Sequence, residues 1–185
     1  MAQICKTERI EGHTLLLRNA QESDAAFIHA LRTDPQRARH LAPTPADVQA
    51  QVDWLRRYER DDTQAYFIIT DRARDGEPLG TIRLHDARGS SFYWGSWLLR
   101  AGVPAHCAVE AVLMLYHYAV RLGFTEARME TRQDNTSVWR FFENFGARRV
   151  GAEGRLFQYE HAPAAMQAGM AKYARYLPHG IRVID

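Results

Sequence analysis

The stretch GSWLLRAGVPAHCAVEAVLMLYHYAVRLGF, residues 95–124, decides the fold of this chain. It starts with a short apolar run, passes through a loop over residues 100–107, and continues with apolar residues three and four positions apart. This spacing predicts a helix over residues 106–122 that ends at Gly123. Because the second face of the helix is also largely apolar, we expect it to be buried on more than one side.

Strands are predicted on both sides of this helix. Residues 65–71 form an apolar run without a polar face, which is typical of a strand buried on both faces. Residues 78–86 alternate and residues 91–99 are rich in aromatic side chains, so these three segments predict an antiparallel meander. A further strand over residues 126–132 follows the helix. A strand, a crossover helix and a strand predict a parallel pair inside a mixed sheet.

The N-terminal part contains a short strand and two helices in this interpretation. The strand covers residues 14–18, and the first helix ends near Arg32 because Pro35 removes the next backbone donor. The second helix is expected to begin over residues 44–47, where a hydroxyl cap precedes a proline and a carboxylate follows.

The C-terminal part closes the sheet. A short aromatic helix over residues 137–145 ends on Gly146, and two strands are expected near residues 148–151 and 156–161. We therefore predict one α/β (α+β) domain over residues 1–185, a twisted mixed sheet of six or seven strands with flanking helices. In this prediction residues 164–185 form a peripheral helix and tail.

Composition excludes several classes of protein. Of the 185 residues, 46% are hydrophobic, and 24 basic against 22 acidic residues give a net charge of +2, which does not point to nucleic acid. Only Cys5 and Cys107 are cysteines, so neither a disulfide framework nor a cysteine-based zinc site is expected, and the eight histidines have no metal-binding spacing. No stretch approaches the roughly 20 apolar residues of a membrane span, and the N-terminus lacks the apolar core of a signal peptide. We expect a cytoplasmic protein without a metal.

Four short pieces of the sequence resemble the GNAT superfamily of acyl-CoA N-acyltransferases, in particular its RimJ/RimL-like branch. They are Leu15-Leu16-Leu17-Arg18 with Asp24, Leu79-Gly80-Thr81-Ile82, Gly95-Ser96-Trp97-Leu98-Leu99, and Asn135 followed by Arg140-Phe141-Phe142-Glu143-Asn144-Phe145-Gly146-Ala147. The last is the most specific, and the order and spacing of all four carry the assignment. The resemblance implies a GNAT-like sheet that is splayed where acetyl-CoA enters, and acetyl transfer to a primary amine by direct attack.

The resemblance also implies where acetyl-CoA binds. The acyl arm would pair with the open strand edge at residues 97–99, and the pyrophosphate would meet the amides at the start of the core helix. The family loop reads Gln/Arg-x-x-Gly-x-Gly/Ala, and here only Ala108 conforms, although Pro104 leaves the amides of residues 105–108 intact. The expected donor-binding residues are Trp97, Leu98, Leu99, Arg100, Val103, Ala105, His106, Cys107, Ala108, Asn135 and Phe142.

Acid–base chemistry has several candidate side chains. The attacking amine must be neutral, so a base is useful, and His85 is the first candidate and Glu130 the second. The alternative for His85 is a purely structural role on its strand, and the alternative for Glu130 is an ordinary cross-strand ion pair. Phe142 stands where the family has a proton-donating tyrosine, so Tyr159, Tyr93 or water would have to protonate the thiolate.

Several functions stay open at this stage. The unusual phosphate loop and the run at residues 95–99 resemble enzymes that acetylate amino sugars carried on nucleotides. Acetylation of a protein N-terminus, a polyamine or a drug-like amine is the nearest alternative. A degenerate domain with a structural or regulatory role is the alternative outside catalysis. A small-molecule amine is the expected partner, and a homodimer stays open.

Overall fold

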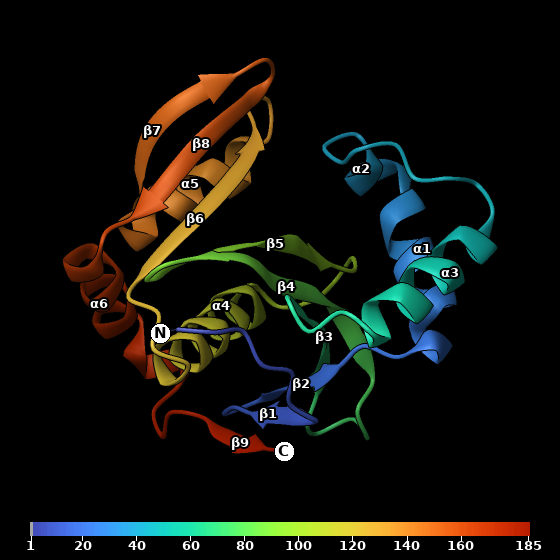
Figure 1. Ribbon diagram of the computed structural model, residues 1–185, viewed down its shortest axis with the longest axis horizontal. Helices are drawn as coiled ribbons and strands as arrows, with labels where there is room; N and C mark the ends of the chain where they lie inside the picture. The colour runs from blue at the N-terminus through green and yellow to red at the C-terminus, as the bar shows by residue number, and fades with distance from the viewer. Residues whose placement is uncertain (1) are drawn as a thin grey trace.

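The computed structural model describes residues 2–185, and in this part a mostly antiparallel open sheet of nine strands is flanked by six α-helices (Figure 1). The strand order is β7-β8-β6-β5-β4-β3-β2-β1-β9. The strands are β1 (Arg9–Glu11), β2 (Leu15–Asn19), β3 (Ala65–Asp71), β4 (Pro78–Arg88), β5 (Ser91–Leu99), β6 (Glu126–Arg132), β7 (Arg148–Glu153), β8 (Leu156–His161) and β9 (Arg182–Ile184). The helices are α1 (Ala25–Thr33), α2 (Pro35–Ala38), α3 (Val48–Glu59), α4 (Ala105–Arg121), α5 (Thr136–Phe145) and α6 (Pro163–Lys172). The predicted mixed α/β architecture is confirmed.

The central part of the sheet follows the sequence pattern closely. Strands β3, β4 and β5 form the predicted antiparallel meander, and α4 connects β5 to β6, which run parallel. Strand β3 is buried on both faces, as its unbroken apolar run predicted. Phe67 and Ile69 enter the large core that contains α4, whereas Tyr66 and Ile68 enter a second cluster under α1 and α3.

Helix α4 is the buried spine of the large core. Ten of its residues are buried, in agreement with its two apolar faces. Its one buried carboxylate, Glu110, accepts hydrogen bonds from the backbone amides of Thr14 and Leu15 at 2.7 and 3.0 Å. These bonds satisfy the charge of Glu110 and fix the start of β2 against the helix.

Strands β5 and β6 separate after a short paired segment. They pair only from Ser91 opposite Glu126 to Tyr93 opposite Arg128. Beyond this point β6, β7, β8 and α5 form one arm of the molecule, and α1, α2 and α3 lie on the other side of the opening (Figure 1). The sheet is therefore splayed at the place where the resemblance implies donor entry.

The ends of the chain differ from the sequence prediction. The sheet has nine strands rather than six or seven, because β1 and β9 were not predicted. Each has three residues, which is too short for a recognisable alternation, and β9 belongs to the tail predicted to be peripheral. Strand β9 pairs with β1 at the edge of the sheet, so the tail returns to the N-terminal segment.

The predicted end of the first helix near Arg32 is confirmed, because α1 ends at Thr33, but the short helix α2 and the start of α3 were not predicted correctly. Pro35 does follow the end of α1, but it also occupies the first turn of α2, whose cap is Asp34. Helix α3 begins at Val48, after the residues 44–47 that were expected to start it, because Asp47 is the cap and accepts from the amide of Gln49 at 2.8 Å.

The motif piece formed by Arg18 and Asp24 has a clear structural role. The two guanidinium nitrogens of Arg18 donate to the carboxylate of Asp24 at 2.7 and 2.8 Å, which joins the end of β2 to the start of α1. Within residues 2–185, no helix is long and apolar enough to cross a membrane.

Candidate active site

A cleft of about 790 Å³ lies where β5 and β6 part. Its floor is β5 from Trp94 to Leu99, and one wall consists of residues 130–132 of β6 with the start of α5. The opposite wall consists of α1, α2 and the loop that follows them. The two walls touch where Nδ1 of His40 lies 3.3 Å from Oδ1 of Asp134.

The cleft side of β5 is an open strand edge. The carbonyl of Leu98 points toward β4, where it approaches Gly80 so closely that a side chain at Gly80 would collide with it. The amide of Arg100 also faces β4 and donates to Leu79 at 2.9 Å. Because backbone groups alternate along a strand, those of Trp97 and Leu99 face the cleft. This edge can pair with an extended ligand as another strand would, once the side chain of Arg37 releases the carbonyl of Leu99.

The structure brings five of the expected donor-binding residues together. All five line the cleft: Trp97, Leu98, Leu99, Asn135 and Phe142. Asn135 is the residue that precedes α5, and Ser137 donates to its side-chain oxygen at 3.2 Å. Phe142 is buried and packs edge-on against Trp94, with ring centroids 5.5 Å apart.

The remaining expected donor residues belong to the loop before α4. Arg100, Val103, His106 and Cys107 line a separate pocket of about 220 Å³, whereas Ala105 and Ala108 line neither this pocket nor the cleft. Pro104 is the cap of α4 and has no side chain that could accept a hydrogen bond. The amide of Cys107 donates to the carbonyl of Pro104 at 3.0 Å, and no side chain of the cap accepts from the other first-turn amides of α4, which an anion can approach.

Two side chains of this loop have roles that the sequence did not reveal. Arg100 is paired with Glu77 and holds the pKa of that carboxyl below its usual range, so its charge is already compensated. Burial raises the pKa of the Cys107 thiol, which therefore stays protonated at neutral pH. A protonated thiol is a poor nucleophile, so this state agrees with direct attack by the amine and not with a covalent acyl intermediate on Cys107.

Of the expected acid–base residues, Glu130 is the one that lines the cleft. Tyr93 lies on the neighbouring strand β5, and its pKa is raised first by burial and then by the negative charge of Glu130. His85 packs behind Tyr93, with ring centroids 5.0 Å apart, and is not among the residues that line the cleft. Burial, together with the charge of Arg83, lowers the pKa of His85 to about 4, so the ring is neutral at pH 7.

Tyr159 does not line the cleft. Its hydroxyl donates to Glu143 at 2.9 Å and accepts from Nε of Arg149 at 3.1 Å. Its ring packs against Phe142, which separates it from the cleft lining.

A second pocket, which sequence reasoning missed, continues from the cleft. It has a volume of about 400 Å³ and shares Arg32, Pro43 and Ser96 with the cleft. Two further arginines, Arg57 of α3 and Arg83 of β4, also line it. The three arginines are about 25 residues apart along the chain, so no local pattern could have indicated that they meet.

The described residues 2–185 contain no group of three His, Cys, Asp or Glu side chains placed to hold a metal ion together.

The comparisons with known proteins agree with this geometry. Residues 14–148 match the family described as the acetyltransferase (GNAT) domain. The chain belongs to the GNAT acetyltransferase family, and it is an acetyltransferase of the class that uses acetyl-CoA as donor. No curated protein matched the chain.

Three similar solved structures illustrate the range of the family. One is FdhC, a nucleotide-linked sugar GNAT in its apo form, at 30% identity and a TM-score of 0.78, covering 96% of this chain and 99% of that chain. A probable acetyltransferase from Chromobacterium violaceum has 18% identity and a TM-score of 0.77, with 90% and 91% coverage. Spermidine N-acetyltransferase from Vibrio cholerae, in complex with CoA and spermine, has 14% identity and a TM-score of 0.70, with 83% and 98% coverage. The similarity to the last two structures shows that this chain has the same fold as they do.

Proposed function

We propose that this protein transfers the acetyl group of acetyl-CoA to the primary amine of an amino sugar that is carried on a nucleotide. The observation that carries the proposal is the arginine-lined pocket that opens into the cleft. A polyamine is itself cationic and needs an acidic groove, whereas three arginines attract an acceptor that carries negative charge. The similarity to FdhC at 30% identity supports the same choice.

The donor arm lies along the open edge of β5 in this proposal. The backbone groups of Trp97 and Leu99 pair with the amides of the arm, and Asn135 and Phe142 border it from α5. A backbone amide of the same edge stabilises the negative charge that develops on the thioester oxygen. The pyrophosphate then meets the first turn of α4, where the amides of residues 105–108 begin the helix.

The reaction is a direct displacement. The neutral amine of the acceptor attacks the thioester carbon, the carbon–sulfur bond breaks, and the thiolate of CoA leaves. Glu130 lines the cleft and takes the proton that the new ammonium group releases. We assign His85 to positioning the ring of Tyr93, because it packs against that ring and does not line the cleft. Water returns a proton to the thiolate, whose parent thiol has a pKa near 8.5. The hydroxyl of Tyr93 is buried and Tyr93 does not line the cleft, so it does not serve as the donor.

An acceptor panel tests the proposal. Release of free thiol from acetyl-CoA is followed with a nucleotide-linked amino sugar, the corresponding free amino sugar, spermidine and a short peptide with a free N-terminus. We expect turnover of the nucleotide-linked sugar with a kcat/KM at least about a hundredfold above the other three. Preference for spermidine or the peptide contradicts the proposal, and binding of acetyl-CoA without turnover of any amine supports a non-catalytic domain.

A further inference from the structure

The arginines of the second pocket differ from most other arginines of the chain. Carboxylates lie within 4 Å of many surface guanidinium groups, as in the pairs of Arg56 with Glu22 and Arg132 with Asp134. Within residues 2–185, no such carboxylate partner is found for Arg32, Arg57 or Arg83. The pocket lining therefore carries three guanidinium charges against the single carboxylate of Asp47, so its net charge is positive.

Arg83 is the most unusual of the three because it is half-buried on a strand. One of its terminal nitrogens donates to Oε1 of Gln64 at 3.2 Å, and its guanidinium lies 5.7 Å from the centre of the Trp54 ring. Its Nε atom is buried and has no hydrogen-bond partner among the described residues. Leaving a buried charged donor unpaired is costly, which indicates that a ligand completes the set.

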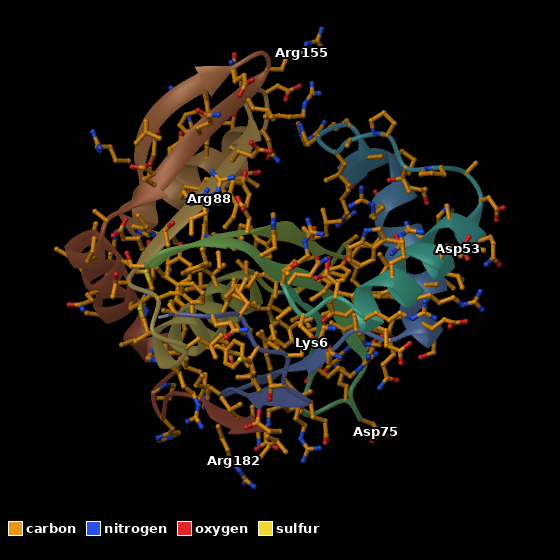
Figure 2. The ribbon with its side chains drawn as sticks, viewed as in Figure 1. Lys6, Asp53, Asp75, Arg88, Arg155 and Arg182 are labelled. Carbon is orange, nitrogen blue, oxygen red and sulfur yellow. The ribbon has the colours of Figure 1, made fainter. Side chains whose placement is uncertain are left out.

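The other two arginines flank Arg83 from the helices. Nε of Arg32 donates to the hydroxyl of Thr44 at 3.2 Å, which leaves its terminal nitrogens available. Arg57 is exposed on α3 and lines the pocket. Asp53, one turn earlier on the same helix (Figure 2), lies 3.7 Å from Arg56 and accepts from the side chain of Gln49 at 3.0 Å. The carboxylate that does line the pocket, Asp47, already accepts from the amide of Gln49 as the cap of α3.

We infer that Arg32, Arg57 and Arg83 form a binding site for the diphosphate group of the acceptor. This assignment rests on the proposed function and adds the residues that recognise the phosphates. Guanidinium groups bind phosphate oxygens through paired N–H donors, and burial of Arg83 strengthens such bonds. Because the pocket shares Arg32 and Ser96 with the cleft, a diphosphate held there leaves the attached sugar to extend toward Glu130.

The test measures binding and not turnover. Titration calorimetry with uridine and thymidine diphosphates, with the matching nucleosides and with inorganic pyrophosphate uses the complete protein without acetyl-CoA. We expect the diphosphates to bind and the nucleosides to bind at least tenfold more weakly. Arg83→Gln is expected to raise the Kd at least tenfold, Arg57→Gln about tenfold, and Arg83→Lys less than Arg83→Gln. Arg60→Gln, an exposed arginine at the end of α3 outside the pocket, is the matched control and leaves the Kd unchanged.

Three results would overturn the inference. They are an unchanged Kd in both Arg83→Gln and Arg57→Gln, equal binding of nucleoside and diphosphate, and displacement of the diphosphate by CoA, which would assign the pocket to the donor. Arg57 is exposed, so its variant remains informative even if Arg83→Gln is unstable. Arginine-dependent diphosphate binding without acetylation of any nucleotide-linked amino sugar leaves the site intact and refutes the proposed function. Acetylation of such a sugar with an unchanged KM in the arginine variants supports the proposed function and refutes the diphosphate site.

Discussion

Nε of Arg37, on the short helix α2, donates a hydrogen bond to the carbonyl oxygen of Leu99 on β5. The carbonyl belongs to the strand edge that faces the cleft, so the side chain of Arg37 covers the point where we propose the donor arm to pair. Arg37 also forms an ion pair with Asp34, with 3.1 Å between Nη1 of Arg37 and Oδ2 of Asp34. The wall formed by α2 is thereby fastened to the floor of the cleft.

The first prediction concerns this contact. Arg37→Ala frees the carbonyl of Leu99 for the donor, so we expect the Kd of CoA to fall about fivefold, the equivalent of about one hydrogen bond. Titration calorimetry with CoA measures it. Arg39→Ala is the matched control, because Arg39 also lines the cleft but its Nε contacts His40 rather than the strand. Weaker binding of CoA by Arg37→Ala would mean that Arg37 holds the donor instead of competing with it.

The second prediction concerns the base. Glu130→Gln keeps the shape of the side chain and removes the proton acceptor, so kcat/KM for the amine should fall about a hundredfold while the Kd of acetyl-CoA stays constant. The loss should shrink as the pH rises toward the pKa of the acceptor amine, because the amine then loses its proton unaided. Glu160→Gln, on β8 and outside the cleft lining, is the control and keeps full activity. A variant of Glu130 with an unaltered pH profile would remove this residue from proton transfer.

The third prediction concerns stability between pH 5 and 6.5. Burial lowers the pKa of His85 to about 4 and also lowers that of His161, whose ring nitrogens lie 3.0 and 3.1 Å from Tyr116 and Phe145. In the unfolded chain these histidines are protonated as the pH falls through about 6.5, whereas in the folded protein the buried rings stay neutral to lower pH. The stabilisation of the folded state by these neutral rings is therefore complete above pH 6.5 and is lost as the pH falls.

Urea unfolding at pH 5.0, 6.0 and 7.5 measures this dependence. The free energy of unfolding should decrease with each step toward acid, and His85→Gln should flatten the decrease. His179→Gln is the control, because the side chain of His179 is exposed. An identical slope in wild type and His85→Gln would contradict the assignment of a buried neutral ring.

The fourth prediction concerns the buried carboxylate of α4. Glu110→Ala leaves the amides of Thr14 and Leu15 and the hydroxyl of Thr14 without their acceptor, so we expect a loss of about 3 kcal/mol in the free energy of unfolding. Glu126→Ala removes one exposed hydrogen bond to Ser90 and should cost under about 0.5 kcal/mol. Equal losses in the two variants would show that Glu110 does not anchor β2.

The sequence predicted best where one pattern repeats over many residues. Helix α4 and strand β3 are long and strongly apolar, and their observed ends lie within one residue of those predicted. Helix α2 was missed because it has four residues, and its proline was interpreted only as a stop for the preceding helix. The strands β1 and β9 depend on their neighbours for hydrogen bonds, which a local pattern does not contain.

The site was less accessible to sequence reasoning than the fold. The open edge of β5 follows from the strand–helix–strand order, which the sequence indicates. The pairing of Arg100 with Glu77 and the meeting of Arg32, Arg57 and Arg83 depend on tertiary contacts between distant segments. Spacing along the chain carries no signal for such contacts, so only the three-dimensional arrangement distinguishes a compensated arginine from a free one.

A crystal structure of the complex with acetyl-CoA tests the central claim most directly. We predict that the donor arm lies between β5 and β6, with its amides bonded to the backbone of Trp97 and Leu99 and the acetyl carbon facing Glu130. Density for acetyl-CoA at any other position, with the cleft still closed by the side chain of Arg37, would contradict the account.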